Sequence, residues 1–231
     1  MSALLRLLAA VLMAGLFISG FFYFVASLLG SLAFNPASKA WKELVAKLRA
    51  RLEPPKPPRK SKLPEVLTPF NTEALTHLSL KPAFTKKTGW FDHTFEGVFN
   101  TIYREPIMVF AGQKNGKNTV VVAKTTDHEF IFQQKAKETH IWMDGVPVAV
   151  WIDGNLLTAG KQGKLLAKMT LDSELRQWPV IIGQSEGATL TNGKLAISPI
   201  PRAVTLLRNL SKVEEETLLV LAVLQGMKQG R

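Results

Sequence analysis

Residues 139–154 read Thr-His-Ile-Trp-Met-Asp-Gly-Val-Pro-Val-Ala-Val-Trp-Ile-Asp-Gly, and this stretch decides the fold class. It contains two short runs rich in Ile, Val and Trp, at 139–143 and 146–152, and each run is followed by Asp-Gly. β-Branched and aromatic residues favour strands. Asp-Gly supplies the positive φ angles that two-residue hairpin turns require. The stretch therefore predicts consecutive antiparallel strands joined by tight turns.

Similar runs occur on both sides of this stretch, and further Asn-Gly pairs stand at 115–116 and 192–193. Many short strands at regular spacing are typical of an antiparallel barrel or sandwich. We therefore expect a β-rich domain over residues 65–200. Its expected strands are 94–103, 107–111, 119–124, 129–133, 139–143, 146–152, 164–169, 180–183, 188–191 and 194–198.

The C-terminal residues 201–231 change period and predict two helices. The first is expected over 201–210, and Ser211-Lys-Val-Glu214 is a capping box that opens the second. The run 217–224 is apolar nearly all round, which indicates a helix that is buried in the core or clasped by a partner. The candidate residues for that contact are Leu218, Leu219, Leu221 and Leu224.

This order of a β-rich run followed by an apolar terminal helix resembles the tubby and LURP-one barrels. The residues that carry the resemblance are Glu129-Phe-Ile-Phe132, Asp144-Gly145, Gly163-Lys164-Leu165 and the run 218–224. The resemblance implies strands that surround a hydrophobic C-terminal helix.

The N-terminal residues 7–34 are uncharged and strongly apolar, after a short extension at 1–6 that carries Arg6. A bilayer core needs about 20 helical residues, so this segment predicts one transmembrane helix. Gly15 and Ser19 are four residues apart, a spacing that lets another helix pack closely. A cleaved signal peptide ending near Ser31-Leu32-Ala33 is the alternative, although the apolar run is longer than such peptides usually have.

Residues 35–53 predict a basic amphipathic helix directly after the span. Its apolar face carries a tryptophan, and its cations make it a candidate for contact with anionic lipid head groups. The candidate membrane-surface residues are Lys39, Trp41, Lys42, Lys47, Arg49 and Arg51. Residues 54–64 contain five prolines and predict an extended spacer.

The formal net charge of +11 sits mainly beside the span. Residues 39–62 hold nine Lys or Arg and two Glu, a net charge of +7. Since positive residues flank the cytoplasmic ends of membrane helices, the C-terminal domain is expected in the cytoplasm. The chain is thus expected to be a single-pass protein of the cell inner membrane. Little net charge remains on the folded domain, and this argues against nucleic-acid binding by that domain.

The motifs associated with catalysis are incomplete. Ser185 lies in a G-x-S-x-G pattern, but a nucleophile elbow needs a later His, and all four histidines precede it. Gly112 and Gly116 miss the spacing of a phosphate-binding loop. No two histidines have the helical spacing of a zinc pair, and the chain has no cysteine. We therefore expect no enzyme activity, no cofactor, no metal site and no small-molecule substrate.

These observations favour a non-catalytic, membrane-anchored scaffold subunit of a bacterial inner-membrane complex, of a secretion, conjugation or energy-transducing type. Its partners would be the lipid bilayer and other membrane protein subunits. The alternative is a membrane-tethered lipid- or ligand-binding β-barrel, which requires an internal cavity. A lesser alternative is nucleic-acid contact through the basic segment 39–62.

Overall fold

The computed structural model of this chain describes residues 34–53, 63–64, 66–88 and 93–229. The chain divides into two compact units at Lys47, and the second unit contains the β domain. The helix α2 (Lys39–Leu52) crosses this boundary. It starts later than the sequence predicts, because Ser38 caps it: the backbone N–H of Trp41 donates to Ser38 Oγ at 3.0 Å.

Twelve antiparallel strands form one sheet, and each strand pairs with the next along the chain. This confirms the predicted antiparallel β domain. The strands are β1 (Ala83–Thr88), β2 (His93–Asn100), β3 (Pro106–Asn115), β4 (Asn118–Lys124), β5 (Glu129–Lys135), β6 (Glu138–Met143), β7 (Val146–Ile152), β8 (Asn155–Thr158), β9 (Leu165–Met169), β10 (Gln177–Ile182), β11 (Ser185–Thr191) and β12 (Val204–Leu206).

The two Asp-Gly pairs form hairpin turns, as the sequence predicts. Asp144 and Gly145 have φ angles of 51° and 81°, and they join β6 to β7. Asp153 and Gly154 have φ angles of 42° and 88°, and they join β7 to β8. Positive φ at both turn residues defines the type I′ turn, whose twist matches that of the paired strands.

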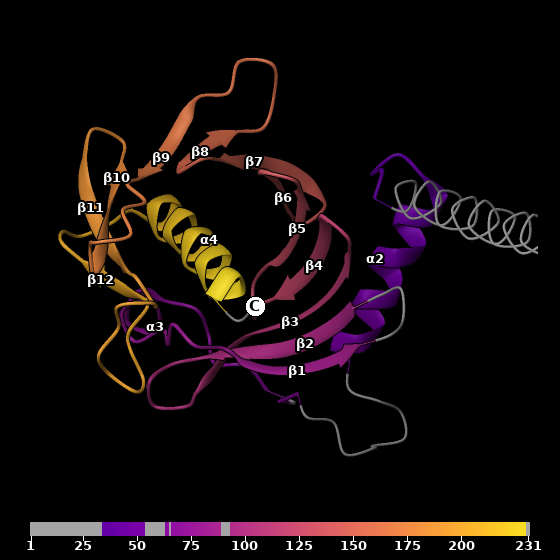
Figure 1. Cartoon of the computed structure of the whole chain (residues 1–231), viewed down its shortest axis with the longest axis horizontal. Coiled ribbons are helices and arrows are strands. Elements are labelled where there is room, and N and C mark those ends of the chain that lie inside the picture. Colours follow the sequence, from indigo (N-terminus) through magenta and orange to yellow (C-terminus); the bar gives the residue numbers. More distant parts are fainter. Residues whose placement is uncertain (1–33, 54–62, 65, 89–92, 230–231) are drawn as a thin grey trace, which may run out of the picture. The chain divides into compact units, whose positions relative to one another are not determined.

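The sheet curls around the C-terminal helix α4 (Lys212–Gln229), which lies inside the curve of the strands (Figure 1). This is the arrangement that the resemblance to tubby and LURP-one barrels implies. The sheet is not closed by strand pairing, since β1 and β12 are its two edges. A short segment ties the two sides together, because Leu78 bridges to Thr101 and Ser79 bridges to Arg202.

Two expectations for local structure are wrong, and some elements were not expected. Residues 201–210 form no helix and instead contain β12, where Val204 pairs with Leu190 of β11. Residues 194–198 form no strand, because the chain after Asn192 leaves the sheet as a loop. The structure also has two strands that the sequence reasoning missed, β1 and β8, and the short helix α3 (Thr72–Thr76).

The predicted transmembrane helix at 7–34 lies outside the described residues, apart from Phe34. Within the part of the chain that the structure describes, no helix combines the length and apolar character needed to cross a bilayer. Gly15 and Ser19, the candidates for helix packing, also lie outside this part, as does most of the expected spacer 54–64.

Candidate functional site

The interior of the sheet is filled by α4. Leu218, Leu219, Leu221 and Leu224, predicted to contact either the core or a partner, are at most 4% exposed and belong to the main hydrophobic core. They share that core with the large side chains Phe110, Phe130 and Trp151. The side chains of α4 therefore occupy the space that the curved sheet surrounds.

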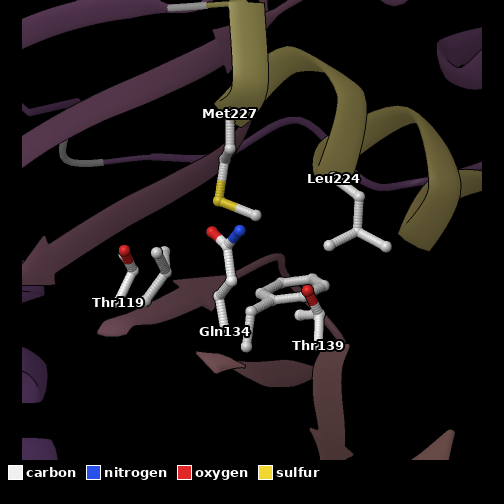
Figure 2. Close-up of a pocket in the computed structure, with 7 residues that line it drawn as sticks. Thr119, Gln134, Thr139, Leu224 and Met227 are labelled. Carbon is white, nitrogen blue, oxygen red and sulfur yellow. The ribbon is translucent and has the colours of Figure 1, made fainter. Parts of the chain in front are cut away.

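A small pocket remains beside the C-terminal part of α4 (Figure 2). Its volume is about 20 Å³, which is room for about one water molecule. Figure 2 shows the amide of Gln134 directed toward Met227, with Thr119 and Thr139 on either side. The other lining residues are Val121, Phe132 and Leu224. A pocket of this size does not hold a lipid or a metabolite.

The first turn of α4 is fixed by a charged network. The backbone N–H of Ser211 donates to Glu214 Oε2 at 2.8 Å, which is the glutamate half of the predicted capping box. Arg208 Nη2 lies 2.5 Å from Glu214 Oε1 and also donates to the carbonyl oxygen of Ile182 at 3.3 Å. The hydrogen bonds from Arg208, followed by those from Ser211, lower the pKa of Glu214 to about 2. This network joins the helix to the end of β10.

A second polar cluster lies at the same end of α4. His128 Nδ1 is 2.7 Å from Asp144 Oδ2, and His128 Nε2 is 3.7 Å from Glu216 Oε1. The backbone N–H of Glu129 donates to Asp144 Oδ1 at 2.9 Å. That hydrogen bond, and then the one to His128, lower the pKa of Asp144. The cluster thus connects three elements: the β4–β5 turn, the β6–β7 turn and α4.

The geometry of this cluster favours a structural role over catalysis. Both carboxylate oxygens of Asp144 are already hydrogen-bonded inside the protein. Among the described residues no group of three or more His, Asp or Glu side chains is arranged to hold a metal ion. Ser185, the serine of the G-x-S-x-G pattern, opens strand β11 directly after the Gly183-Gln184 turn. A nucleophile elbow has a helix at that point.

The candidate membrane-surface residues of α2 have different surroundings. Lys39 pairs with Glu43 at 3.7 Å, while Lys42 and Lys47 are exposed and Arg51 is half-buried. Trp41 is buried, at 7% exposure. Arg49 binds Glu129 of β5 through a bidentate ion pair, with Nε to Oε2 at 2.9 Å, and this pairing raises the pKa of Arg49. Within this set, Lys39, Lys42 and Lys47 are the lysines exposed to solvent, and the side chain of Lys39 is 91% exposed despite its pairing with Glu43.

Sequence reasoning did not find the exposed aliphatic side chains of two loops, 170–176 and 192–203. Leu171, Leu175, Leu195, Ile197 and Ile200 are each at least 36% exposed. Patterning treats apolar residues as buried, and on that basis 194–198 is expected to be a strand. The signal that could have found them is the mixture of these aliphatic residues with charged residues of both signs, Asp172, Glu174, Arg176, Lys194 and Arg202.

Comparisons with known proteins found no matching family model, no matching curated protein and no matching solved structure.

Proposed function

We propose that this protein is a non-catalytic, membrane-anchored scaffold subunit of a bacterial inner-membrane assembly, which binds its partners through the outer surface of the β domain. The observation that carries the proposal is the position of α4. With Leu218, Leu221 and Val223 each fully buried inside the sheet, the domain offers its surface, and not its interior, for binding.

The anchoring part of the proposal rests on the sequence. An uncharged apolar segment at 7–34 is followed by a strongly basic segment at 39–62. That order fits a span whose C-terminal side lies in the cytoplasm. The proline-rich residues 54–64 would hold the β domain away from the bilayer without fixing its orientation.

The rival proposal of a lipid- or ligand-binding barrel needs an internal cavity lined by inward-facing residues. Those residues, such as Phe130 and Trp151, instead pack in the core that contains α4. The pocket beside Met227 has room for about one water molecule. The structure therefore supports the scaffold proposal over the carrier.

The test is affinity purification of the full chain from native membranes in mild detergent, followed by identification of the proteins that copurify. We expect stoichiometric membrane-protein partners that are absent from control membranes without the tagged chain. Recovery of the chain alone across a range of detergent strengths would contradict the scaffold proposal. Extraction of the chain by carbonate wash, without detergent, would contradict the membrane anchor.

A further inference from the structure

The outer face of the curved sheet is covered over part of its length. Val121, Ala123 and Phe130 of β4 and β5 belong to the core that contains α4. Because successive side chains of a strand point to opposite faces, their neighbours Val122 and Ile131 lie on the outer face, where they pair with each other. They are nevertheless 0% and 6% exposed. An outer face that meets water is normally polar, so these two positions indicate a covered area.

This covered area extends over three neighbouring strands. Its apolar residues are each at most 6% exposed and are not members of the main core: Val109 and Ala111 of β3, Val120 and Val122 of β4, and Ile131 of β5. We call these five residues the outer apolar face. The outer face of β9 and β10 is different, because Lys168 and Ile181, which pair there, are both exposed. Coverage is therefore a property of one part of the sheet.

The C-terminal part of α2 lies at the edge of the outer apolar face. Arg49 Nε donates to both carboxylate oxygens of Glu129, at 3.0 Å to Oε1 and at 2.9 Å to Oε2. Glu129 is two residues before Ile131 in β5, so the two side chains point to the same, outer side of the sheet. Next to Arg49 in the helix, Leu48 is only 1% exposed. A buried leucine therefore stands beside an ion pair that joins α2 to the covered strands.

Charge and connectivity favour α2 over a separate molecule as the cover. Glu129 places a carboxylate beside the outer apolar face, where it attracts Arg49 and would repel the head groups of anionic lipids. Because α2 and the sheet belong to one chain, the local concentration of the helix at this face exceeds that of a separate partner.

We infer that the outer apolar face is a helix-docking surface and that residues 47–52 of α2 are its occupant, with Leu48 packed on the apolar side chains and Arg49 paired with Glu129 at the edge. An amphipathic helix laid on an apolar surface is a recurring mode of recognition, in which apolar anchors supply affinity and a charged pair fixes the register. Arg49 is then a protein contact, in place of the lipid contact expected from the sequence. The inference concerns contacts within one chain and does not depend on the proposed function.

The chain has no cysteine, so single cysteines report whether the face is covered. Val122→Cys places a thiol in the outer apolar face, Ala123→Cys places one in the core, and Lys117→Cys places one at an exposed hairpin tip. Each full-length chain is purified in detergent without added lipid or other protein, and the rate of its reaction with a maleimide is measured. We expect Lys117→Cys to react fast, and both Val122→Cys and Ala123→Cys to react slowly.

A charge reversal then undocks the helix. We expect Arg49→Glu to speed the reaction of Val122→Cys by about tenfold, because a bidentate ion pair becomes a contact between two carboxylates. Glu129→Arg in the same chain should restore the slow reaction, since it forms the ion pair again with opposite polarity. Lys47→Glu makes the same charge change at an exposed position of the same helix and should leave the rate unchanged. Ala123→Cys should stay slow in every background, which would show that the sheet and its core remain folded.

Four results would overturn the inference. Fast reaction of Val122→Cys in the otherwise unchanged chain would show that the chain does not cover this face. Protection that appears only after anionic vesicles or a copurified protein are added would make lipid or a partner the occupant. Equal rates in the Arg49→Glu and Lys47→Glu backgrounds would show that the ion pair does not hold the cover. A parallel rise at Val122→Cys and Ala123→Cys would show loosening of the sheet and not undocking. None of these results bears on the copurification of partners, so failure here and failure of the proposed function are distinguishable.

Discussion

Arg208 and Glu214 form an ion pair, with 2.5 Å between Nη2 and Oε1, at the point where the chain passes from the sheet into the helix α4. Glu214 also accepts the backbone N–H of Ser211, so a single carboxylate caps the helix and joins it to the preceding segment. The helix that fills the interior is thus held at its first turn by a group that titrates in acid.

Through this pairing, the ionisation of Glu214 makes the free energy of unfolding of the domain depend on pH in the acid range. The pKa of Glu214 falls from the ordinary value of 4.5 to about 2, so its contribution is fully present above pH 4.5 and is lost as the pH falls toward 2. We expect Glu214→Gln to lower the free energy of unfolding at pH 7 and to differ little from the parent near pH 2. Urea unfolding across this pH range measures the difference. A difference that does not change with pH would contradict the prediction, and the exposed Glu186→Gln is the control.

Gly226 of α4 lies against Phe99 of β2, and this contact leaves no room for a side chain. A Cβ added at Gly226 would be 2.5 Å from Phe99 Cε1. Alanine normally stabilises a helix relative to glycine, but here we expect Gly226→Ala to destabilise by about 1–3 kcal/mol through overpacking. Thermal or urea unfolding measures the loss.

The smaller side chain of Phe99→Leu should relieve this clash. In a double-mutant cycle, the cost of Gly226→Ala should therefore be smaller in the Phe99→Leu background than in the parent chain. Equal costs in the two backgrounds would show that the helix does not approach β2 as closely as described.

The hairpins of this domain could be predicted because their signals are local. Asp144-Gly145 and Asp153-Gly154 carry the required φ angles in their own residue types. The strand β12 could not be predicted in this way. Leu206, Leu207 and Leu210 match a helical spacing, and only the pairing of residues 204–206 with β11 decides between a helix and a strand. Tertiary contacts override local preference in such short segments.

The candidate site could likewise be predicted only where its residues carry a local signal. The apolar run 217–224 indicated burial, but only the structure places Leu221 inside the sheet. Asn192-Gly193 matches a hairpin signal, yet Asn192 uses its side chain to hold a loop that ends 16 residues earlier, at Arg176. A contact between distant segments has no local signature, so the pairing of loops 170–176 and 192–203 could not be found by periodicity.

Leu221 should be one of the most sensitive positions of the chain. It is 0% exposed at the centre of α4, so Leu221→Ala is expected to cost about 2–5 kcal/mol, the range for large-to-small changes in a packed core. Val213→Ala in the first turn of the same helix is 67% exposed and should change the free energy of unfolding by less than about 0.5 kcal/mol. Urea unfolding compares the two. Similar small effects at both positions would mean that α4 is not part of the core.

Asn192 joins the loops 170–176 and 192–203, because its backbone N–H donates to the carbonyl oxygen of Arg176 and its side chain to that of Leu175. It is predicted to control both the stability and the local order of these loops. In Asn192→Ala the carbonyl oxygen of Leu175 and the N–H of Lys194 lose their partly buried hydrogen bonds to the side chain of Asn192, each worth about 0.5–1.5 kcal/mol. The exposed Asn209→Ala is the control and should be close to neutral.

Hydrogen exchange provides a second measurement, because the amide of residue 192 is bonded to the carbonyl oxygen of Arg176. We expect that amide to exchange faster in Asn192→Ala, while amides of β4 and β5 keep their protection at matched global stability. Unchanged exchange at residue 192 would show that the strand pairing of β10 and β11 alone holds the loops, without the asparagine side chain.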